Sequence, residues 1–416
     1  MEHLALGGEH LAGESLNLLL VGVDLVGLAH SARREGHRVF AADYFGDLDL
    51  KKACDRCLSV IHQEKDKSTG TFESVFDPRD FVDMARELCG EVQMDGILLS
   101  SGLDDSFDEL HELGELAPIM GNPHETVKKV REKGSFFREL ERLNIPHPRT
   151  AIVRDLEGAR DAALDIGYPL ALKPLEGFAG SSIRRVGKPQ TLDAAYIDVQ
   201  RSNSGAVVQE YIDGTHASIS LMASSSGAVT LTLNEQLLGL EEVYQREPFG
   251  YCGNIVPLEV KDSTTEYCKE IAEKIGGHFG LKGSNGIDFV ISGDGVPHVV
   301  EVNPRFQGTL EAVETVLGMN LVKMHLLACR QGVLPTNLGD PSRYSTRLIL
   351  YAPRKLVTPD LTHVDGVTDI PLPGSILEEG EPFCSLNSTG DSREASLGKA
   401  KKMAELIYGS IRWVRH

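Results

Sequence analysis

Residues 16–44 hold two apolar runs separated by a helical pattern, and this arrangement limits the fold more than any other feature. The first run, LNLLLVGV, is continuously apolar, which is typical of a strand buried on both faces. It is followed by the helical segment LVGLAHSARRE, a stop at Gly36 and a second run, RVFAADY. Parallel strands joined in this way form right-handed crossovers almost without exception. With a further strand in GILLSSG, residues 15–120 are expected to form a small open α/β domain.

The turn after the first strand lacks the spacing of a dinucleotide-binding loop. It reads GVDLVG from Gly22 to Gly27 rather than GxGxxG, although Asp43 ends the second strand near the usual position of a ribose-binding acid. We favour an α/β scaffold whose turn requires small residues. NAD-dependent oxidoreduction stays open as an alternative.

The remainder of the 416 residues is long enough for further domains. A helix is expected from Pro123 to the NIPHP break, and a helix with several strands follows it up to the turn after VVQEYIDG. Strands with one helix are expected as far as residue 332. The segment LPTNLGDPS then indicates a linker, and the last part of the chain a smaller unit of strands closed by a helix.

Charge and cysteine content restrict the partners and the compartment. A formal charge of -19 argues against non-specific binding to nucleic acid or to an anionic membrane. No apolar run approaches the roughly 20 residues that span a bilayer, and the first residues do not resemble a signal peptide. The seven cysteines are scattered, and the pair Cys54 and Cys57 is interpreted as structural thiols. We expect a cytoplasmic protein with neither nucleic acid nor membrane as a partner.

Three segments carry candidate chemistry. Lys173 precedes the small-residue loop EGFAGSS, a combination suited to polyphosphate, although an ordinary hairpin beside an exposed lysine is the alternative. The strand VVQEYIDG would leave Gln209 or Glu210 to contact a purine, or is simply a strand and turn. Asp288 lies in GIDFVI, and VVEVNPR places Glu301, Asn303 and Arg305 at alternate positions. This oxygen-rich set suits Mg²⁺, and Arg305 could then neutralise charge on a phosphoryl group. The alternative is an edge strand with one solvated face. Val299, Val300 and Val302 disfavour it, because they are typical of a central strand, where solvated polar groups are costly.

Taken in order, these segments resemble the ATP-grasp superfamily over about residues 16–329. In REKGSFFRELERLNIPHPRT, Lys133 matches the family's first phosphate lysine, and Lys173 matches the second. The resemblance implies ATP as cosubstrate and Mg²⁺ or Mn²⁺ as metal, with Lys173 and Arg305 as catalytic residues and Asp288, Glu301 and Asn303 as metal ligands. It also implies nucleotide contacts from the loop and the inter-lobe segment, namely Gly177, Gly180, Ser181, Ser182, Glu210, Tyr211, Ile212 and His216.

The resemblance also implies a domain order. An N-terminal Rossmann-like domain (15–120) would precede a two-lobed ATP-grasp domain (121–332), with a lid lobe at about 150–213 and a central lobe at about 214–332. A small α+β domain similar to the C-terminal domain of biotin carboxylase would occupy residues 340–416. Within the superfamily, YFGDLDL, SSGLDDSFDEL and the tail resemble an uncharacterised archaeal-type, carboligase-like group related to biotin carboxylase.

The function implied is that of a ligase that activates a small-molecule carboxylate as an acyl phosphate and joins it to an amine, with a homodimer as a possible assembly. A bicarbonate-dependent carboxylase is an alternative, but Thr309 stands where biotin carboxylase has a glutamate, and Glu311 cannot be assumed to replace it. Gln307 matches that pattern. A non-catalytic ATP-binding protein is the other alternative. The loops that hold Asp104 and Asp105, and residues 249–257, are candidates to line the substrate pocket.

Overall fold

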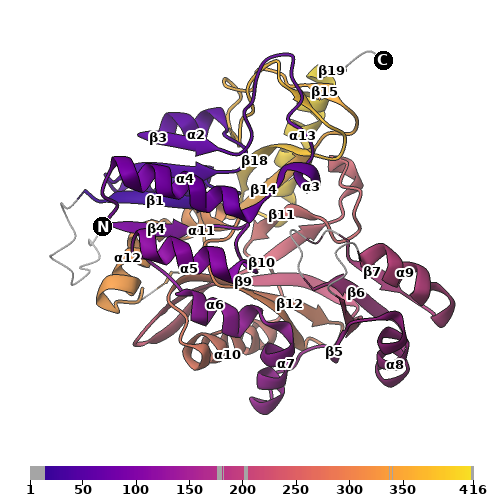
Figure 1. Cartoon of the computed structure of the whole chain (residues 1–416). Helices are drawn as coiled ribbons and strands as arrows, with labels where there is room; N and C mark the ends of the chain where they lie inside the picture. The colour runs from indigo at the N-terminus through magenta and orange to yellow at the C-terminus, as the bar shows by residue number, and fades with distance from the viewer. Residues whose placement is uncertain are drawn as a thin grey trace.

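The computed structural model describes residues 15–175, 180, 182–200, 205–336, 338–339 and 341–413. Its N-terminal part is a four-stranded parallel sheet in the order β3-β2-β1-β4, shown in indigo in Figure 1. The strands are β1 (Asn17–Gly22), β2 (Arg38–Asp43), β3 (Arg56–Ser59) and β4 (Gly96–Leu99). The helices are α1 (Val26–Arg34), α2 (Leu48–Ala53), α3 (Phe72–Val75), α4 (Pro78–Glu91) and α5 (Phe107–Leu116). The expected open α/β arrangement is confirmed.

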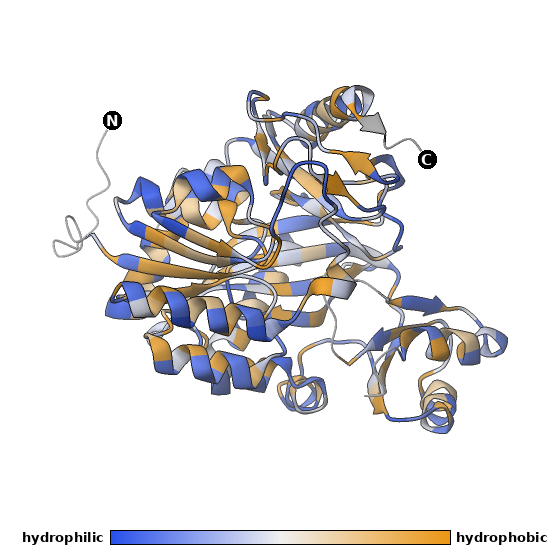
Figure 2. Ribbon diagram, turned by 45° about the horizontal axis from the view of Figure 1, so that its top comes forward, coloured by the Kyte–Doolittle hydropathy of each residue, from blue (hydrophilic) through white to orange (hydrophobic). Residues whose placement is uncertain are grey.

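The apolar composition of β1 explains its central place in this sheet. Leu18, Leu19, Leu20 and Val21 are fully buried, and Figure 2 shows the strands as hydrophobic ribbons behind helices with hydrophilic outer faces. Asp43 ends the neighbouring strand but is only 1% exposed. Its carboxylate accepts a hydrogen bond from the backbone N–H of Gly46 at 2.6 Å, and burial raises its pKa well above the ordinary range. A carboxyl group enclosed in this way cannot reach a ribose, which removes the ground for the dinucleotide alternative.

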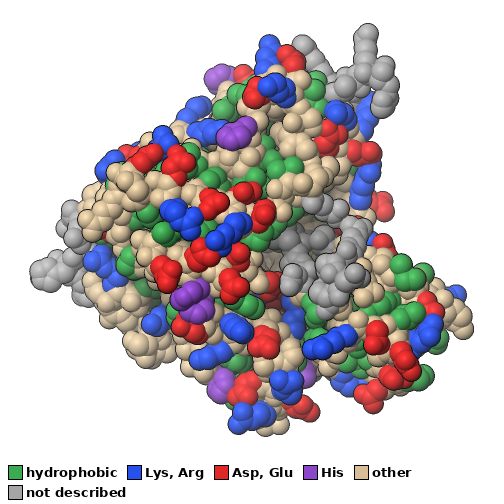
Figure 3. All heavy atoms as spheres, in the orientation of Figure 1, with side chains coloured by type: hydrophobic (Ala, Val, Ile, Leu, Met, Phe, Trp, Pro, Cys, Tyr) green, Lys and Arg blue, Asp and Glu red, His purple; other side chains and the backbone are tan. Residues whose placement is uncertain are grey.

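A small lobe projects from the body of the molecule at the lower right of Figures 1 and 3. It is an antiparallel sheet in the order β5-β8-β6-β7 with its own apolar core. Its elements are β5 (Thr150–Val153), α8 (Leu156–Ile166), β6 (Leu170–Pro174), β7 (Arg184–Val186), η1 (Pro189–Thr191), α9 (Leu192–Val199) and β8 (Ala206–Glu210).

The helix expected from Pro123 is in fact two helices, α6 (His124–Arg131) and α7 (Lys133–Arg142). The break falls at Glu132, whose backbone is extended with φ -69 and ψ 92. Gly134, two residues after the break, was the local signal that disfavours a continuous helix, and the single-helix expectation ran through it. The break places Arg131 at the end of one helix and Lys133 at the start of the next.

The largest sheet has eight strands in the order β13-β12-β9-β10-β11-β14-β18-β16. Its strands are β9 (Gly214–Ser224), β10 (Gly227–Leu238), β11 (Tyr251–Val256), β12 (Gly283–Ser292), β13 (Pro297–Asn303), β14 (Tyr344–Tyr351), β16 (Val367–Thr368) and β18 (Pro382–Gly390). The accompanying helices are η2 (Glu241–Val243), α10 (Asp262–Phe279), α11 (Leu310–Leu317), α12 (Leu321–Gln331) and α13 (Arg393–Ser410). A separate small sheet joins β15 (Leu356–Val357), β17 (Ile376–Leu377) and β19 (Arg412–Trp413).

The C-terminal segment is part of the large sheet rather than a separate layer. β14 pairs antiparallel with β11, and β18 continues the sheet beyond β14. The apolar core beneath these strands also draws residues from both sides of the expected linker, among them Ile255, Leu348 and Ile407. The boundary at residues 332–340 remains a prediction, and the sheet runs across it.

Two surface properties bear on the expected partners. Among the described residues, no single helix has the length and apolar character needed to cross a membrane; α11 and α12 meet that test only together, by length and composition, and they are bent by 96°. On the face drawn in Figure 3, acidic and basic side chains are interspersed over the described part of the chain.

Candidate functional site

A cavity of about 870 Å³ is bounded by the N-terminal sheet, the small lobe and one face of the eight-stranded sheet. Its wall contains most of the residues that the sequence singled out: Lys133, Lys173, Gly180, Glu210, Tyr211, Ile212, His216, Asp288, Glu301, Asn303 and Arg305. Ser182 is buried in its loop and does not belong to that wall. Gly177 and Ser181 lie outside the described residues. The wall also contains Asp24 and Arg347, which are 323 residues apart, so segments distant in the chain meet at one cavity.

The acidic face of the cavity comes from the paired strands β12 and β13. Asp288 lies opposite Glu301 in the antiparallel register, and Asn303 lies opposite Gly286 on the same face. Asn303 donates a hydrogen bond from Nδ2 to Asp288 Oδ2 at 3.1 Å. The register shifts between Asp288 and Phe289, so that Val300 joins the cavity wall while Val299 and Val302 are fully buried in the core. A β-bulge thus interrupts the strict alternation of side chains between the two faces of the strand that the sequence predicted.

The two carboxyl groups differ in protonation. Burial and the neighbouring Glu301 raise the pKa of Asp288 to about 7. Burial also disfavours the Glu301 anion, but Arg131, Lys133 and Lys173 outweigh that effect and lower its pKa to about 2. Two acids this close repel each other when both are ionised, and a divalent cation between them would relieve the repulsion. The oxygen donors of this face therefore fit Mg²⁺.

The described residues offer no group of three or more His, Cys, Asp or Glu side chains that could hold a metal ion. Asp288 and Glu301, with the amide of Asn303, make a partial set of oxygen ligands. Mg²⁺ is usually held in this way, by one or two carboxylates plus phosphate oxygens and water. The site therefore fits a metal that arrives with a polyphosphate better than a resident one.

Lys133 and Lys173 supply positive charge opposite these acids. Lys173 is on β6 of the small lobe, and Lys133 begins α7. Burial lowers the pKa of Lys173 to about 8; Glu301 and Asp288 favour its charged form and Lys133 opposes it. Cations from one side and carboxylates from the other make a site where a metal-bound polyphosphate would be neutralised.

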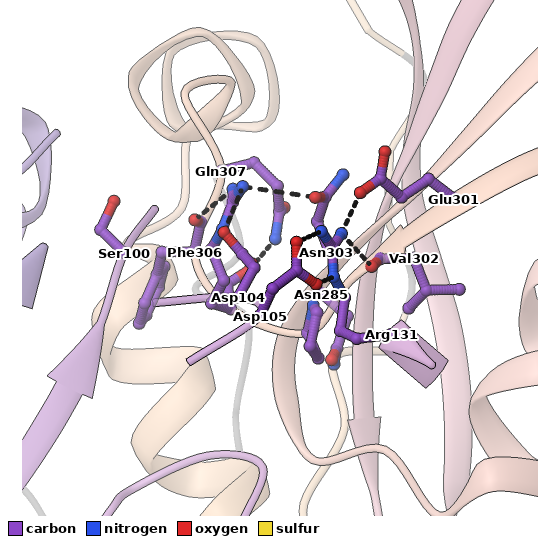
Figure 4. A network of polar contacts seen from close by, with 12 residues as sticks. Ser100, Asp104, Asp105, Arg131, Asn285, Glu301, Val302, Asn303, Phe306 and Gln307 are labelled. Carbon is purple, nitrogen blue, oxygen red and sulfur yellow. Dashed lines mark hydrogen bonds and ion pairs between the residues drawn. The ribbon is translucent and has the colours of Figure 1, made fainter. Parts of the chain in front are cut away.

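Two arginine–aspartate pairs fix the acidic face, and Figure 4 shows Arg131 with its partners Asp105 and Glu301. Arg131 donates from Nε and Nη2 to the two carboxylate oxygens of Asp105, each at 2.8 Å, and also pairs with Glu301. Arg305 donates from Nε to Asp104 Oδ1 at 3.0 Å and from Nη2 to Asn303 Oδ1 at 3.3 Å. The loop acids that we expected to line the substrate pocket therefore hold the two arginines. Asp104 is on the wall and Asp105 is behind it.

Arg131 is a residue that the sequence reasoning missed. In the sequence Arg131 is one of several basic residues in the expected helix. In the structure the helix ends at Arg131, and the break at Glu132 directs this side chain to the cavity. Its position two residues before Lys133 was the one available signal.

The opposite wall is formed by the connection between the small lobe and the large sheet. Rings of Tyr211 and His216 each lie 6.3 Å from the ring of Phe249. Burial, followed by the nearby Lys173, lowers the pKa of His216 and keeps it neutral. Gly180 has φ +75, and a Cβ there would lie 2.0 Å from the carbonyl oxygen of Phe249, so only glycine lets the loop approach this closely. Glu210 accepts hydrogen bonds from Arg149 N at 3.2 Å and Nε at 3.4 Å, which turns its carboxylate toward that arginine.

The cavity has a second end, which no sequence motif announced. Arg347 on β14 donates from Nη1 to Asp24 Oδ2 at 2.6 Å and from Nη2 to Asp24 Oδ1 at 3.0 Å. Nη2 also donates to Asp369 Oδ2 at 2.8 Å. Two buried polar atoms on this wall, Asn254 Oδ1 and Arg347 Nε, have no hydrogen-bond partner within the described part of the chain.

Residues 306–309 link the part of the cavity wall that holds Arg305 with the part that holds Arg347. Gln307, Gly308 and Thr309 are on the cavity wall. The Thr309 hydroxyl lies 3.2 Å from that of Ser220, so this position presents a hydroxyl and no carboxylate. Glu311 is on a small adjoining pocket, where burial raises its pKa to about 7 and Asn387 donates to it at 3.3 Å. It does not occupy the place of Thr309.

Comparisons with known proteins agree with this geometry. Residues 130–309 match the family model described as the ATP-grasp domain. The chain is similar to an uncharacterised protein of Methanocaldococcus jannaschii, with 25% identity over 91% of this chain and 89% of that protein. It is also similar to the carbamoyl phosphate synthase large chain of Clostridium acetobutylicum, with 24% identity over 66% of this chain, and it spans only 26% of that relative's length.

Solved structures share the whole architecture. The biotin carboxylase domain of 2-oxoglutarate carboxylase from Hydrogenobacter thermophilus, in complex with MgADP, ADP and bicarbonate, has a TM-score of 0.74 and 16% identity over 96% of this chain and 91% of that chain. L-amino acid ligase from Bacillus licheniformis has a TM-score of 0.70 and 18% identity over 97% of this chain and 99% of that chain. Likeness at this identity establishes the fold alone. The chain therefore contains an ATP-grasp domain, and its fold is that of biotin carboxylase and related ATP-grasp ligases.

Proposed function

We propose that this protein is a Mg²⁺- and ATP-dependent ligase that activates a small-molecule carboxylate as an acyl phosphate and joins it to an amine, releasing ADP and phosphate. The observation that carries the proposal is the meeting of Lys133 and Lys173 with Asp288 and Glu301 at one cavity. Phosphoryl transfer is catalysed mainly by positioning and charge neutralisation, which is what this set of groups supplies.

In this proposal the nucleotide lies between the small lobe and the large sheet. The base would occupy the wall that contains Tyr211, Ile212 and His216, with the described loop residue Gly180 near the phosphates. Lys133 and Lys173 would contact phosphate oxygens. Mg²⁺, or Mn²⁺ in its place, would be held by Asp288, Glu301 and Asn303 and would neutralise phosphate charge.

The chain's own residues then support two steps. In the first, a substrate carboxylate oxygen forms a bond to the γ-phosphorus of ATP, and the bond from that phosphorus to the β–γ bridging oxygen breaks to leave ADP. Lys173 and Arg305 would stabilise the charge on the transferred phosphoryl group. In the second, the substrate ammonium group first loses a proton to solvent; the neutral amine nitrogen then bonds to the acyl carbon, the carbon–oxygen bond breaks and phosphate leaves with the electron pair. The nitrogen loses its extra proton to solvent or to phosphate, and an amide results.

The position of Thr309 argues against a bicarbonate-dependent carboxylase, because a hydroxyl bonded to Ser220 cannot supply the carboxylate base of that reaction. The complete set of charged groups on the cavity wall argues against a protein that binds ATP without turnover.

The test is to incubate the protein with ATP, Mg²⁺ and fractionated metabolite extracts and to measure the nucleotide products. ADP and phosphate should appear only with particular fractions, and formation of AMP and pyrophosphate would exclude the acyl phosphate route. Glu301→Gln should abolish the release of ADP, whereas Glu270→Gln, at an exposed position on α10, should not. Steady ATP binding with no turnover in any fraction would favour the non-catalytic alternative.

A further inference from the structure

We propose that the amine acceptor is a primary amine with an apolar body and no carboxylate, bound with its ammonium group against Asp24 and Asp369. This inference rests on the proposed ligase function, since it assigns the acceptor of that reaction. It concerns the second end of the cavity, defined here by Asp24, Asp369, Arg347, Asn254 and the aromatic side chains described below.

The charge at this end is negative where a ligand can reach it. The side chain of Arg347 is only 7% exposed, whereas those of Asp24 and Asp369 are 28% and 21% exposed. The guanidinium therefore lies behind the two carboxylates that it pairs with. One cation is shared between two anions, so the surface that faces the cavity keeps a net negative charge. An ammonium group would be attracted there, and a substrate carboxylate would be repelled.

The polar atoms behind this end are out of reach of a ligand. Asn254 is fully buried, and its Nδ2 donates to the Tyr251 hydroxyl at 2.6 Å. Asn254 Oδ1 and Arg347 Nε have no partner within the described residues, but both atoms are buried beneath the cavity surface. Polar contact with a ligand at this end therefore comes from the carboxylates of Asp24 and Asp369.

The rest of this end is aromatic and apolar. Tyr44 and Phe72 have ring centroids 4.7 Å apart, and Phe72 stacks on Phe76 at 4.6 Å. These three rings line the cavity together with Leu377 and Phe383 from the C-terminal part of the chain. An isolated β-bridge pairs Ser68 with Ile376, so the segment that contains Phe72 lies beside the segment that contains Leu377. A hydrocarbon or aromatic body would bury its surface here at a gain of about 25 cal/mol per Å².

An amino acid is a poor match at this end because Asp24 and Asp369 would repel its carboxylate, and Arg347 is held behind these two acids. Arg246 also lines the cavity, but it is paired with Glu379. Glu381 adds a further acidic group to the wall. The protein should therefore bind an amine more tightly than the amino acid that carries one additional carboxylate.

The amine would lie next to the site of phosphoryl transfer. Gly308 follows Arg305 by three residues, and its carbonyl oxygen accepts a hydrogen bond from Arg347 Nη1 at 3.0 Å. A Cβ on Gly308 would lie 2.9 Å from Arg347 Nη1 and 3.2 Å from Asp24 Oδ2. Asn254 also pairs in register with Arg347 on β14 and with Gln236 on β10. The two ends are thus joined by one short segment and one row of the sheet.

The experiment measures binding by isothermal titration calorimetry on the full chain, with and without Mg²⁺ and a non-hydrolysable ATP analogue. The probes are 2-phenylethylamine, L-phenylalanine, which adds the carboxylate, and 2-phenylethanol, which lacks the ammonium group. The amine should bind at least tenfold more tightly than either of the others. Asp24→Asn should weaken amine binding at least tenfold. Asp369→Asn, which keeps the Asp24–Arg347 pair, provides the second test if the first variant fails to fold.

The proposal fails if L-phenylalanine or 2-phenylethanol binds as tightly as the amine, if no amine binding is detected, or if folded Asp24→Asn and Asp369→Asn proteins both bind it normally. Affinity for the ATP analogue is measured on the same preparations. Amine binding without nucleotide binding would refute the ligase and leave the amine site in place. Nucleotide binding and ADP release without amine binding would refute the acceptor class and leave the ligase in place.

Discussion

Replacing Arg131 by methionine should destabilise the protein because it leaves two acids without their cation. Arg131 has a side chain that is only 3% exposed, and it pairs with both Asp105 and Glu301. Methionine has a similar length and flexibility but no charge. Arg138→Met, at an exposed position on α7, is the matched control.

The size of the effect follows from the electrostatics of Glu301. One pKa unit corresponds to about 1.4 kcal/mol, so a carboxyl held at about 2 instead of its ordinary 4.5 would contribute at most about 3 kcal/mol. The carboxylate is 36% exposed, and Lys133 and Lys173 share this stabilisation with Arg131, so the share of Arg131 after solvent screening is about 1 kcal/mol. Loss of the bidentate Asp105 pair adds to this, since breaking a buried ion pair costs about 3–5 kcal/mol. The two contributions sum to a loss of about 4–6 kcal/mol in the free energy of unfolding at pH 7.

The assay is urea denaturation of both variants and the unchanged protein between pH 7 and pH 3. Because the folded pKa of Glu301 is depressed, its contribution is present above pH 4.5 and disappears as the pH falls toward 2. The difference between Arg131→Met and the unchanged protein should therefore shrink below pH 4.5. A difference below 1 kcal/mol at pH 7, or one that grows on acidification, would refute the reasoning.

Three further predictions concern the cavity. Burial lowers the pKa of Lys173 to about 8, so affinity for ATP should fall as the pH rises above 8, whereas Lys173→Arg should show a flat profile in the same titration; parallel profiles would contradict this. Asp288→Asn should abolish Mg²⁺-dependent ADP release yet leave the melting temperature equal or higher, because it removes a repelling carboxylate; full turnover in this variant would place the metal elsewhere. Gly308→Ala should reduce amine affinity roughly fivefold, about 1 kcal/mol, with ATP affinity unchanged, because the new Cβ would crowd Arg347; equal loss for both ligands would indicate general disruption.

The placing of Lys173, Glu301, Asn303 and Arg305 on one cavity wall was predictable from the sequence because its signals are local. Lys173 precedes its small-residue loop directly, and Glu301 and Asn303 alternate along one strand, with Arg305 two residues beyond its end. Such patterns report which residues share a face even when the partner strand is unknown. The parallel N-terminal sheet was predictable for the same reason.

The end of the cavity formed by Asp24, Asp369 and Arg347 was not predictable, because its groups meet only through tertiary structure. Asp24 and Arg347 are 323 residues apart, and Asp24 stands in a turn where its carboxylate looked unremarkable. Arg347 lies within YSTRLILY, where a single charge in an apolar strand carries no information about its partner. The break at Glu132 has only a weak local signal, the glycine at position 134, so the sequence reasoning missed both the break and the position of Arg131.

The pairing of β14 with β11 determines how far the chain can be shortened. A protein ended after Gln331 would keep the entire matched family segment but would leave the backbone groups of β11 open along one side. An uncovered strand of this kind recruits strands from other molecules. The same cut would strip Leu348, Leu386 and Ile407 from the core that buries Ile255. The part of the molecule that matches the family model therefore depends on the last residues of the chain to stay unaggregated, although those residues lie outside the matched segment.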